Sequence, residues 1–275
     1  MAVRTGGAAA TKQFFYEGTM NSAQPARYAP PVFLVFLGLN IVLFAIQLLQ
    51  GIDPMSPDTV GMIRWGANLA PLTLTGEPWR LLSSMFLHFG LIHLALNCYM
   101  LLMLGGIVER EFGSARFALI YLLSGLFGSL ASALWYTSFK VSAGASGALM
   151  GIAGACLAHA LIAWLRKEQS EAVRLTGPLT QTIGINLVLG ALNPAVDNAC
   201  HVGGLLAGAL IGAVFTVTRF EHSAAKRAAA AAIVSVAALA LLYVTVSRPP
   251  SPELVQLKLQ LQAELDGKPP MAEAP

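Results

Sequence analysis

The sequence predicts an all-α fold, a polytopic bundle of membrane-spanning helices. Of its 275 residues, 56% are hydrophobic and only 11% are charged, which is less than half the charged fraction of a typical soluble domain. A membrane-spanning helix needs about 20 apolar residues, and the chain contains seven apolar segments separated by more polar connections. The formal charge of +3 is too small to indicate nucleic-acid binding.

The seven apolar segments divide the chain. The fifth is the shortest, and Asn186 interrupts it. A long connection between the first two segments, residues 51–85, contains Trp and Arg, and such composition suits a loop lying against lipid headgroups. The apolar segments lie at 32–50, 86–107, 116–137, 146–165, 180–192, 199–218 and 228–247.

Four regions follow from these segments. Residues 1–30 hold no apolar run of the kind found in a signal peptide, so we expect a cytoplasmic N-terminal tail. Residues 31–220 form a six-helix core, 221–248 a linker and seventh span, and 249–275 a polar C-terminal tail. In that tail Ser251 begins a helix-start pattern, but leucines then alternate with period two, which leaves its structure open. The three cysteines are scattered in apolar stretches and do not form a disulfide framework.

Lysines and arginines predict the orientation, because cytoplasmic segments carry an excess of them. With the N-terminus in the cytoplasm, eleven of the seventeen fall in inner segments and six in outer ones. The inner ones are Arg4, Lys12, Arg27, Arg110, Arg116, Arg166, Lys167, Arg174, Arg219, Lys226 and Arg227.

This orientation brings four polar side chains to one depth. The second, fourth and sixth spans all run from the outer to the inner side. His93 and Asn97 lie early in the second span and share one helix face, Ser146 opens the fourth, and His201 lies near the start of the sixth. Polar residues within membrane spans are costly and are functional candidates by default. His88 precedes this layer, in the loop that enters the second span.

Small residues in the fourth and sixth spans predict that these two helices touch. Residues of this size at i and i+4 allow two backbones to approach closely in a membrane. Such contact would bring the Ser146 hydroxyl within hydrogen-bond range of the His201 ring, and a nearby base is what a serine nucleophile needs. The small residues are Gly144, Gly147, Gly151, Gly154 and Ala155 in and before the fourth span, and Gly203, Gly204, Ala207, Gly208 and Gly212 in the sixth.

Taken in order, these residues resemble the motifs of rhomboid intramembrane serine proteases. The resemblance runs from residue 79 to residue 208 and so covers the six-helix core. Each motif alone is weak, but their order on the correct helices is specific. The motifs are Trp79-Arg80, His88, His93-x-x-x-Asn97, Gly105-Gly106, Glu109-Arg110, Gly144-x-Ser146-Gly147 and His201-x-x-Gly204-x-x-x-Gly208.

The resemblance implies a role for each site residue. Ser146 would be the nucleophile and His201 the general base and then the general acid. His93, Asn97 and the Ser146 backbone N–H would stabilise the oxyanion. Met150 stands where the family often has an aromatic residue under the imidazole. Structural or supporting roles fall to Trp79, Arg80, His88, Glu109, Gly144, Gly147, Gly204 and Gly208.

The resemblance also predicts the setting of the reaction. The substrates would be transmembrane segments of other membrane proteins, and neither a cofactor nor a metal is needed. The active site would face the outer side of a membrane, with a bacterial inner membrane as our interpretation of the compact loops. The loop 193–198 is placed to cap the site, and the short fifth span is a candidate lateral gate.

Two other functions stay open. A non-proteolytic member of the same fold would bind membrane clients, although such proteins typically lack the serine or the histidine. A small transporter would spread polar residues through the whole membrane depth and repeat paired half-helices, neither of which the sequence shows. A zinc protease is disfavoured because the chain has no His-Glu-x-x-His motif, although His88, His93 and His201 could in principle form a metal-binding trio.

Overall fold

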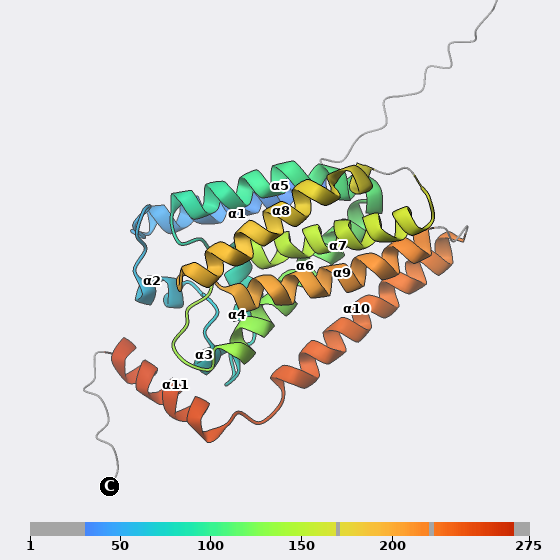
Figure 1. Cartoon of the computed structure of the whole chain (residues 1–275). Coiled ribbons are helices and arrows are strands. Elements are labelled where there is room, and N and C mark those ends of the chain that lie inside the picture. Colours follow the sequence, from blue (N-terminus) through green and yellow to red (C-terminus); the bar gives the residue numbers. More distant parts are fainter. Residues whose placement is uncertain (1–30, 169–170, 220–222, 267–275) are drawn as a thin grey trace, which may run out of the picture.

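The computed structural model describes residues 31–168, 171–219 and 223–266. Within them, seven helices are long and apolar enough to cross a membrane, and they pack side by side as a bundle (Figure 1). The predicted all-α polytopic fold is confirmed. The proposed N-terminal tail, residues 1–30, lies outside the described residues. The seven helices are α1 (Val32–Leu49), α5 (Leu91–Phe112), α6 (Ser114–Trp135), α7 (Ser146–Leu165), α8 (Glu171–Leu192), α9 (Asn198–Arg219) and α10 (Ala224–Val246).

The prediction of a short fifth span was wrong. Helix α8 has 22 residues, and its part Val173–Leu192 is apolar enough to cross the membrane. The first turns of this helix could not be recognised from the sequence because Arg174 and Pro178 lower the local hydropathy and because proline usually ends a helix. Here the helix continues through Pro178, since a membrane offers backbone groups no alternative partner to their own helix.

The long connection 51–85 folds into four short helices at the end of the bundle where α7 and α9 begin, which we call the site end. They are α2 (Thr59–Arg64), α3 (Ala70–Thr73), α4 (Arg80–Ser83) and the 3₁₀ helix η1 (Ser84–Phe86).

Arg80 holds this connection together. Its buried guanidinium donates to the carbonyl oxygens of Ile63 at 2.7 Å and Ala67 at 3.1 Å and pairs with Glu77 at 2.7 Å. Its neighbour Trp79 is 51% exposed, and its ring lies 4.7 Å from the Arg80 guanidinium carbon. These contacts support the structural roles expected of both residues.

Glu109 joins three helices at the opposite end of the bundle. Its carboxylate accepts the backbone N–H groups of Val32 and Phe33, each at 2.9 Å, and the hydroxyl of Ser114. The first N–H groups of a helix have no partner within it, so Glu109 caps α1 from α5 while holding the start of α6.

Helices α7 and α9 are in direct backbone contact. A Cβ built on Gly204 would lie 2.1 Å from the Gly147 carbonyl oxygen, and one on Gly208 would lie 2.0 Å from that of Gly151. The next pair, Ala155 and Gly212, repeats the contact: a Cβ built on Gly212 would lie 2.5 Å from the Ala155 Cα. Each pair is separated by 57 residues in the sequence (204 − 147, 208 − 151, 212 − 155), so the helices run parallel and in register. In this register Ser146 lies level with Gly203 (146 + 57 = 203), two residues after His201, so Ser146 and His201 lie at similar depths.

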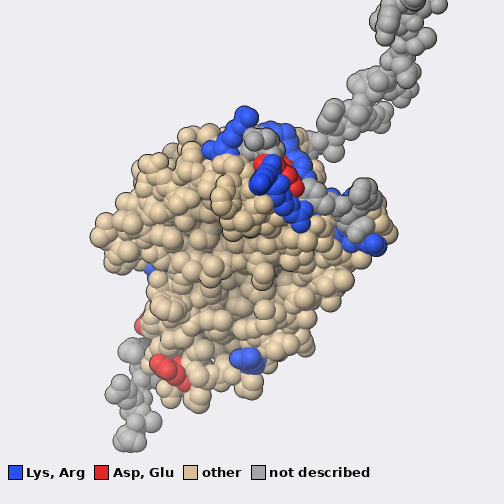
Figure 2. Space-filling model, turned by 45° about the vertical axis from the view of Figure 1, so that its right-hand side comes forward, with Lys and Arg blue, Asp and Glu red and all other residues tan. Residues whose placement is uncertain are grey.

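The end opposite the site end carries most of the basic residues. Figure 2 shows Lys and Arg gathered at one end of the molecule, above a broad band without charges. By the helix directions this basic end holds Arg110, Arg116, Arg166, Lys167, Arg174, Arg219, Lys226 and Arg227.

His159 lies toward the basic end. It is thirteen residues beyond Ser146 in α7, about 20 Å along the helix axis. Its Nδ1 lies 3.2 Å from Thr216 Oγ1 and its Nε2 lies 3.3 Å from a Glu111 carboxylate oxygen. It is a helix-interface residue, remote from Ser146.

The C-terminal segment forms a further helix, α11 (Pro252–Leu265). The Ser251 hydroxyl accepts the Leu254 N–H at 3.3 Å and so caps its start. The period-two leucines do not make a strand, because Leu254 and Leu261, seven residues apart, lie on one helix face and are both buried against the bundle. Residues 267–275 of the tail lie outside the described part.

Candidate active site

The segment before α7 delivers Ser146 to the site end. Asn68 and Ser142 form an isolated antiparallel pair, with N–H to carbonyl distances of 2.8 Å and 2.9 Å. Gly144 then turns the chain with a φ of +137°, and its N–H donates to the Ser84 carbonyl at 2.8 Å. A side chain at Gly144 would be strained by this φ and would also lie 2.7 Å from the His93 ring. Ser146 follows as the first residue of α7.

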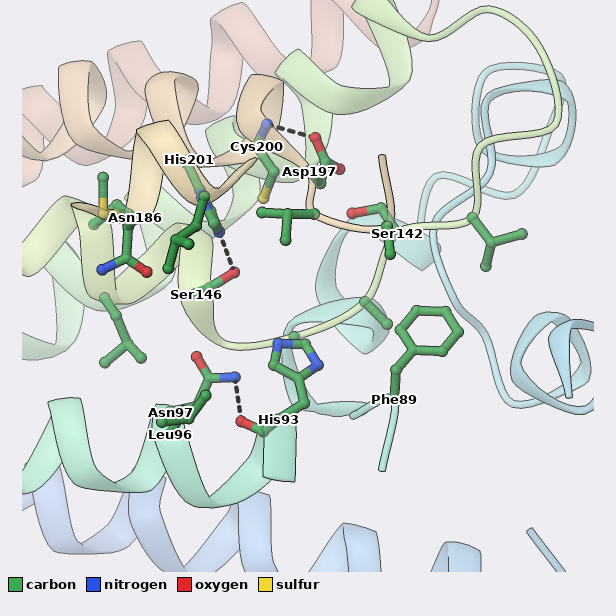
Figure 3. A pocket seen from close by; sticks show the side chains of 18 of the residues that line it. Phe89, His93, Leu96, Asn97, Ser142, Ser146, Asn186, Asp197, Cys200 and His201 are labelled. Atoms are coloured by element: carbon green, nitrogen blue, oxygen red, sulfur yellow. Dashed lines mark hydrogen bonds between the residues drawn. The ribbon is translucent and has the colours of Figure 1, made fainter. Parts of the chain in front are cut away.

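Ser146 and His201 are in hydrogen-bond contact. The distance between Ser146 Oγ and His201 Nε2 is 2.9 Å, and the two side chains come from the adjacent starts of α7 and α9 (Figure 3). For Nε2 to accept the serine proton, the proton of a neutral imidazole must lie on Nδ1. His201 Nδ1 is buried and has no hydrogen-bond partner within the described residues.

Asp197 caps α9, and its carbonyl oxygen accepts the His201 backbone N–H at 3.1 Å. Among the described contacts, its carboxylate makes no hydrogen bond to the His201 ring. One oxygen of its carboxylate accepts the Cys200 N–H at 2.9 Å, and the residue is partly buried. A carboxylate at a helix start is favourable there. Among the described residues, the Ser146–His201 pair therefore has no third side chain in hydrogen-bond contact with the imidazole.

His93 and Asn97 face this pair from α5. Figure 3 shows both side chains extending from α5 toward Ser146, opposite His201. The Asn97 amide donates one hydrogen to the His93 carbonyl at 3.0 Å, which leaves its second N–H for a ligand. The predicted spacing of four residues thus places both on one face of the helix, as expected.

His88 lies behind His93. Its ring is fully buried, and the centroids of the His88 and His93 rings lie 5.3 Å apart in an edge-to-face arrangement. Burial, with His93 as the second cause, lowers the pKa of His88 to about 3, so the residue is neutral at physiological pH. Among the described residues, no three His, Cys, Asp or Glu side chains cluster closely enough to hold a metal ion, which includes the trio of His88, His93 and His201.

A cavity of about 670 Å³ contains all four polar candidates. Met150, one turn after Ser146 in α7, lines it and is itself buried. The loop before α9 covers one side with Ala195, Val196 and Asp197, and the Lys140 ammonium ties this loop to the segment before α7 by donating to the Pro194 and Val196 carbonyls. The predicted capping position of this loop agrees with that arrangement.

Sequence reasoning missed one wall of the cavity. Residues 139–144, which include Val141 and Ser142, line it and run directly into Ser146. Lys140 is the one charged residue of this segment, and only its last residue, Gly144, belongs to a motif recognised in the sequence. No disulfide joins the three cysteines, all of which are described, and the Sγ of Cys200 packs against Gly147.

The sequence model of the Rhomboid domain matches residues 75–218, slightly more than half of the chain. The chain belongs to the rhomboid family. The predicted resemblance is thereby confirmed, and this rhomboid-family chain is a multi-pass membrane protein.

Its curated relatives include bacterial and plant proteins. It is 34% identical over 240 residues to Rhomboid protease GluP of Bacillus subtilis (strain 168), covering 87% of this chain and 45% of that protein. It is 32% identical over 203 residues to Rhomboid protease AarA of Providencia stuartii, covering 66% of this chain and 71% of that protein. With RHOMBOID-like protein 2 of Arabidopsis thaliana it shares 47% identity over 141 residues, which are 51% of this chain and 43% of that protein. The chain spans about half the length of several curated plant relatives that it matches.

Proposed function

We propose that this rhomboid-family chain is an intramembrane serine endopeptidase that hydrolyses peptide bonds in or near transmembrane segments. One observation carries the proposal: Ser146 Oγ lies 2.9 Å from His201 Nε2 within a cavity between membrane-spanning helices. A serine with a base at this distance is an activated nucleophile.

The chemistry follows from the positions of the four side chains. Ser146 Oγ attacks the scissile carbonyl carbon while His201 Nε2 takes the hydroxyl proton. The oxyanion receives hydrogen bonds from the free N–H of Asn97, the His93 ring and the Ser146 backbone N–H. His201 then protonates the leaving amine, and a water molecule hydrolyses the acyl-enzyme by the same steps in reverse.

The substrate segment must unwind before it reacts. A helical backbone uses its own carbonyl oxygens in hydrogen bonds, so a scissile carbonyl becomes available only where the helix opens. The cavity at the site end provides space for such a segment, and α8, which lines it with Asn186 and Leu189, is the proposed lateral gate.

The orientation is part of the proposal. The basic residues gather at the end opposite the cavity, and the positive-inside rule assigns that end to the cytoplasm. The cavity then opens toward the outer face, and a bacterial inner membrane is the proposed location.

Replacing Asn97 with alanine is expected to lower kcat by about 10²- to 10³-fold, the cost of removing one oxyanion donor. KM for a transmembrane substrate should stay nearly constant, because the amide acts on charge that develops in the transition state. Steady-state cleavage kinetics in detergent measure both constants. A rise in KM at unchanged kcat would instead assign Asn97 to substrate binding.

Cleavage of a reconstituted substrate tests the proposed function. The purified full chain in phospholipid vesicles should cut a single-span protein carrying tags on both sides of its transmembrane segment. A client-binding protein would retain the tagged span without cutting it, and a transporter would give solute flux in place of cleavage. Either result, with a folded protein, would reject the protease.

A further inference from the structure

Helix α11 is docked on the site end of the bundle, beside α3 (Figure 1). Leu254 packs with Ala70 of α3 and Ala133 of α6, while Leu261 packs in a cluster with α2 and α3 residues. The Lys258 ammonium donates to the Thr75 carbonyl oxygen at 2.9 Å. Two buried leucines and one charge-assisted hydrogen bond thus fix α11 to the short helices at the site end.

The Leu261 cluster continues into the wall of the cavity. Val141 packs against this cluster and also lines the cavity. Leu69, a member of the same cluster, follows Asn68, whose backbone pairs with Ser142 in both directions. One side chain and one pair of backbone hydrogen bonds therefore connect α11 to the segment that leads into Ser146.

The Ser146–His201 contact depends on other interactions. It is set by the glycine contacts between α7 and α9, whereas Leu254 and Leu261 of α11 pack on residues of α2, α3, α6 and the segment before α7. A change in α11 should therefore move the cavity wall at 139–144 and leave the reactive pair in place.

We propose that α11 is a positioning element for substrate binding, which acts through Val141 and the Asn68–Ser142 pair to hold the cavity wall that a substrate backbone contacts. This proposal rests on the proteolytic function proposed above. It predicts an effect on KM for a transmembrane substrate, with little effect on the reactivity of Ser146 toward a small probe.

A matched pair of substitutions in α11 tests this role. Leu261 is 5% exposed and Leu259 is 49% exposed. Leu261→Ala and Leu259→Ala therefore remove the same atoms from the same helix, but only Leu261→Ala removes a side chain that is buried against the bundle. In full-length protein in vesicles, Leu261→Ala should raise KM by roughly three- to thirty-fold, the range for residues coupled to a site at a distance. The KM of Leu259→Ala should match that of wild type. The KM of Leu261→Met should lie close to the wild-type value, because methionine keeps the apolar volume of leucine.

A double-mutant comparison tests the route through Val141. If α11 acts through this side chain, Leu261→Ala should have little further effect on KM once Val141→Ala is present. Labelling of Ser146 by a fluorophosphonate should proceed at the wild-type rate in Leu261→Ala.

The outcomes distinguish a failure of the positioning role of α11 from a failure of the proposed protease function. Equal KM values for Leu261→Ala and Leu259→Ala, in a protein that cleaves, would overturn the positioning role alone. A loss of labelling in Leu261→Ala would also overturn it, because the helix would then support the whole fold. A folded wild type that neither cleaves nor is labelled would reject the protease, and the positioning role with it.

Discussion

Replacing Ser146 with alanine is expected to reduce cleavage of a transmembrane substrate by on the order of 10⁴- to 10⁶-fold, the loss seen when a serine protease loses its nucleophile. His201→Ala should cost a similar factor, since the 2.9 Å contact between Oγ and Nε2 makes the two side chains one reacting unit. The double variant should be no slower than either single variant, because residues that act as a unit are not additive. Initial rates with a fluorogenic single-span substrate measure all three.

Ser235→Ala provides a matched control for this result. Ser235 lies in α10, and its hydroxyl donates to the Ala231 carbonyl at 2.8 Å, so the same change is made on a membrane helix away from the cavity. Its rate should equal that of wild type. Additive losses in the Ser146 and His201 variants would show that the two side chains work independently.

The second large effect is expected at the contact between α7 and α9. Gly208→Ala places a Cβ 2.0 Å from the Gly151 carbonyl oxygen and 2.4 Å from its Cα. These are backbone atoms, so the helices must separate. A shift of about 1 Å at a reacting pair can cost about 10²-fold in rate, and we expect a loss of at least this order in kcat.

Gly38→Ala in α1 is the control for Gly208→Ala. A Cβ on Gly38 would meet nothing within 4 Å, so the same added methyl group should leave cleavage and thermal unfolding unchanged. Gly208→Ala should also unfold at a lower temperature in detergent. Wild-type kcat in Gly208→Ala would mean that the backbone contact does not set the distance between Ser146 and His201.

Much of the site could be predicted because membrane topology restricts depth. Once the helix directions were known, Ser146, His201, His93 and Asn97 had to lie in one layer, and the small residues of two spans indicated which helices touch. The register of that contact required coordinates, because Gly147 has two candidate partners in Gly203 and Gly204, and only packing selects Gly204.

The errors also have physical causes. The length of α8 was underestimated because proline and arginine ordinarily end an apolar span, whereas the membrane keeps the helix intact around Pro178. The structure of α11 stayed open because its leucines fit both a period of two and a helical face, and the packing of Leu254 and Leu261 on the bundle decides between them. Apart from Gly144, the cavity wall at 139–144 carries no motif, because its role depends on the pairing of Asn68 with Ser142, which are 74 residues apart (142 − 68).

Labelling of Ser146 by a fluorophosphonate, located by peptide mass spectrometry, tests the central claim most directly. The probe reacts with a serine activated by a neighbouring base, so wild type in vesicles should carry the label on Ser146 and His201→Ala should not. Equal labelling of both proteins, or cleavage by a wild type whose Ser146 stays unlabelled, would contradict the Ser146–His201 pair as the reacting centre.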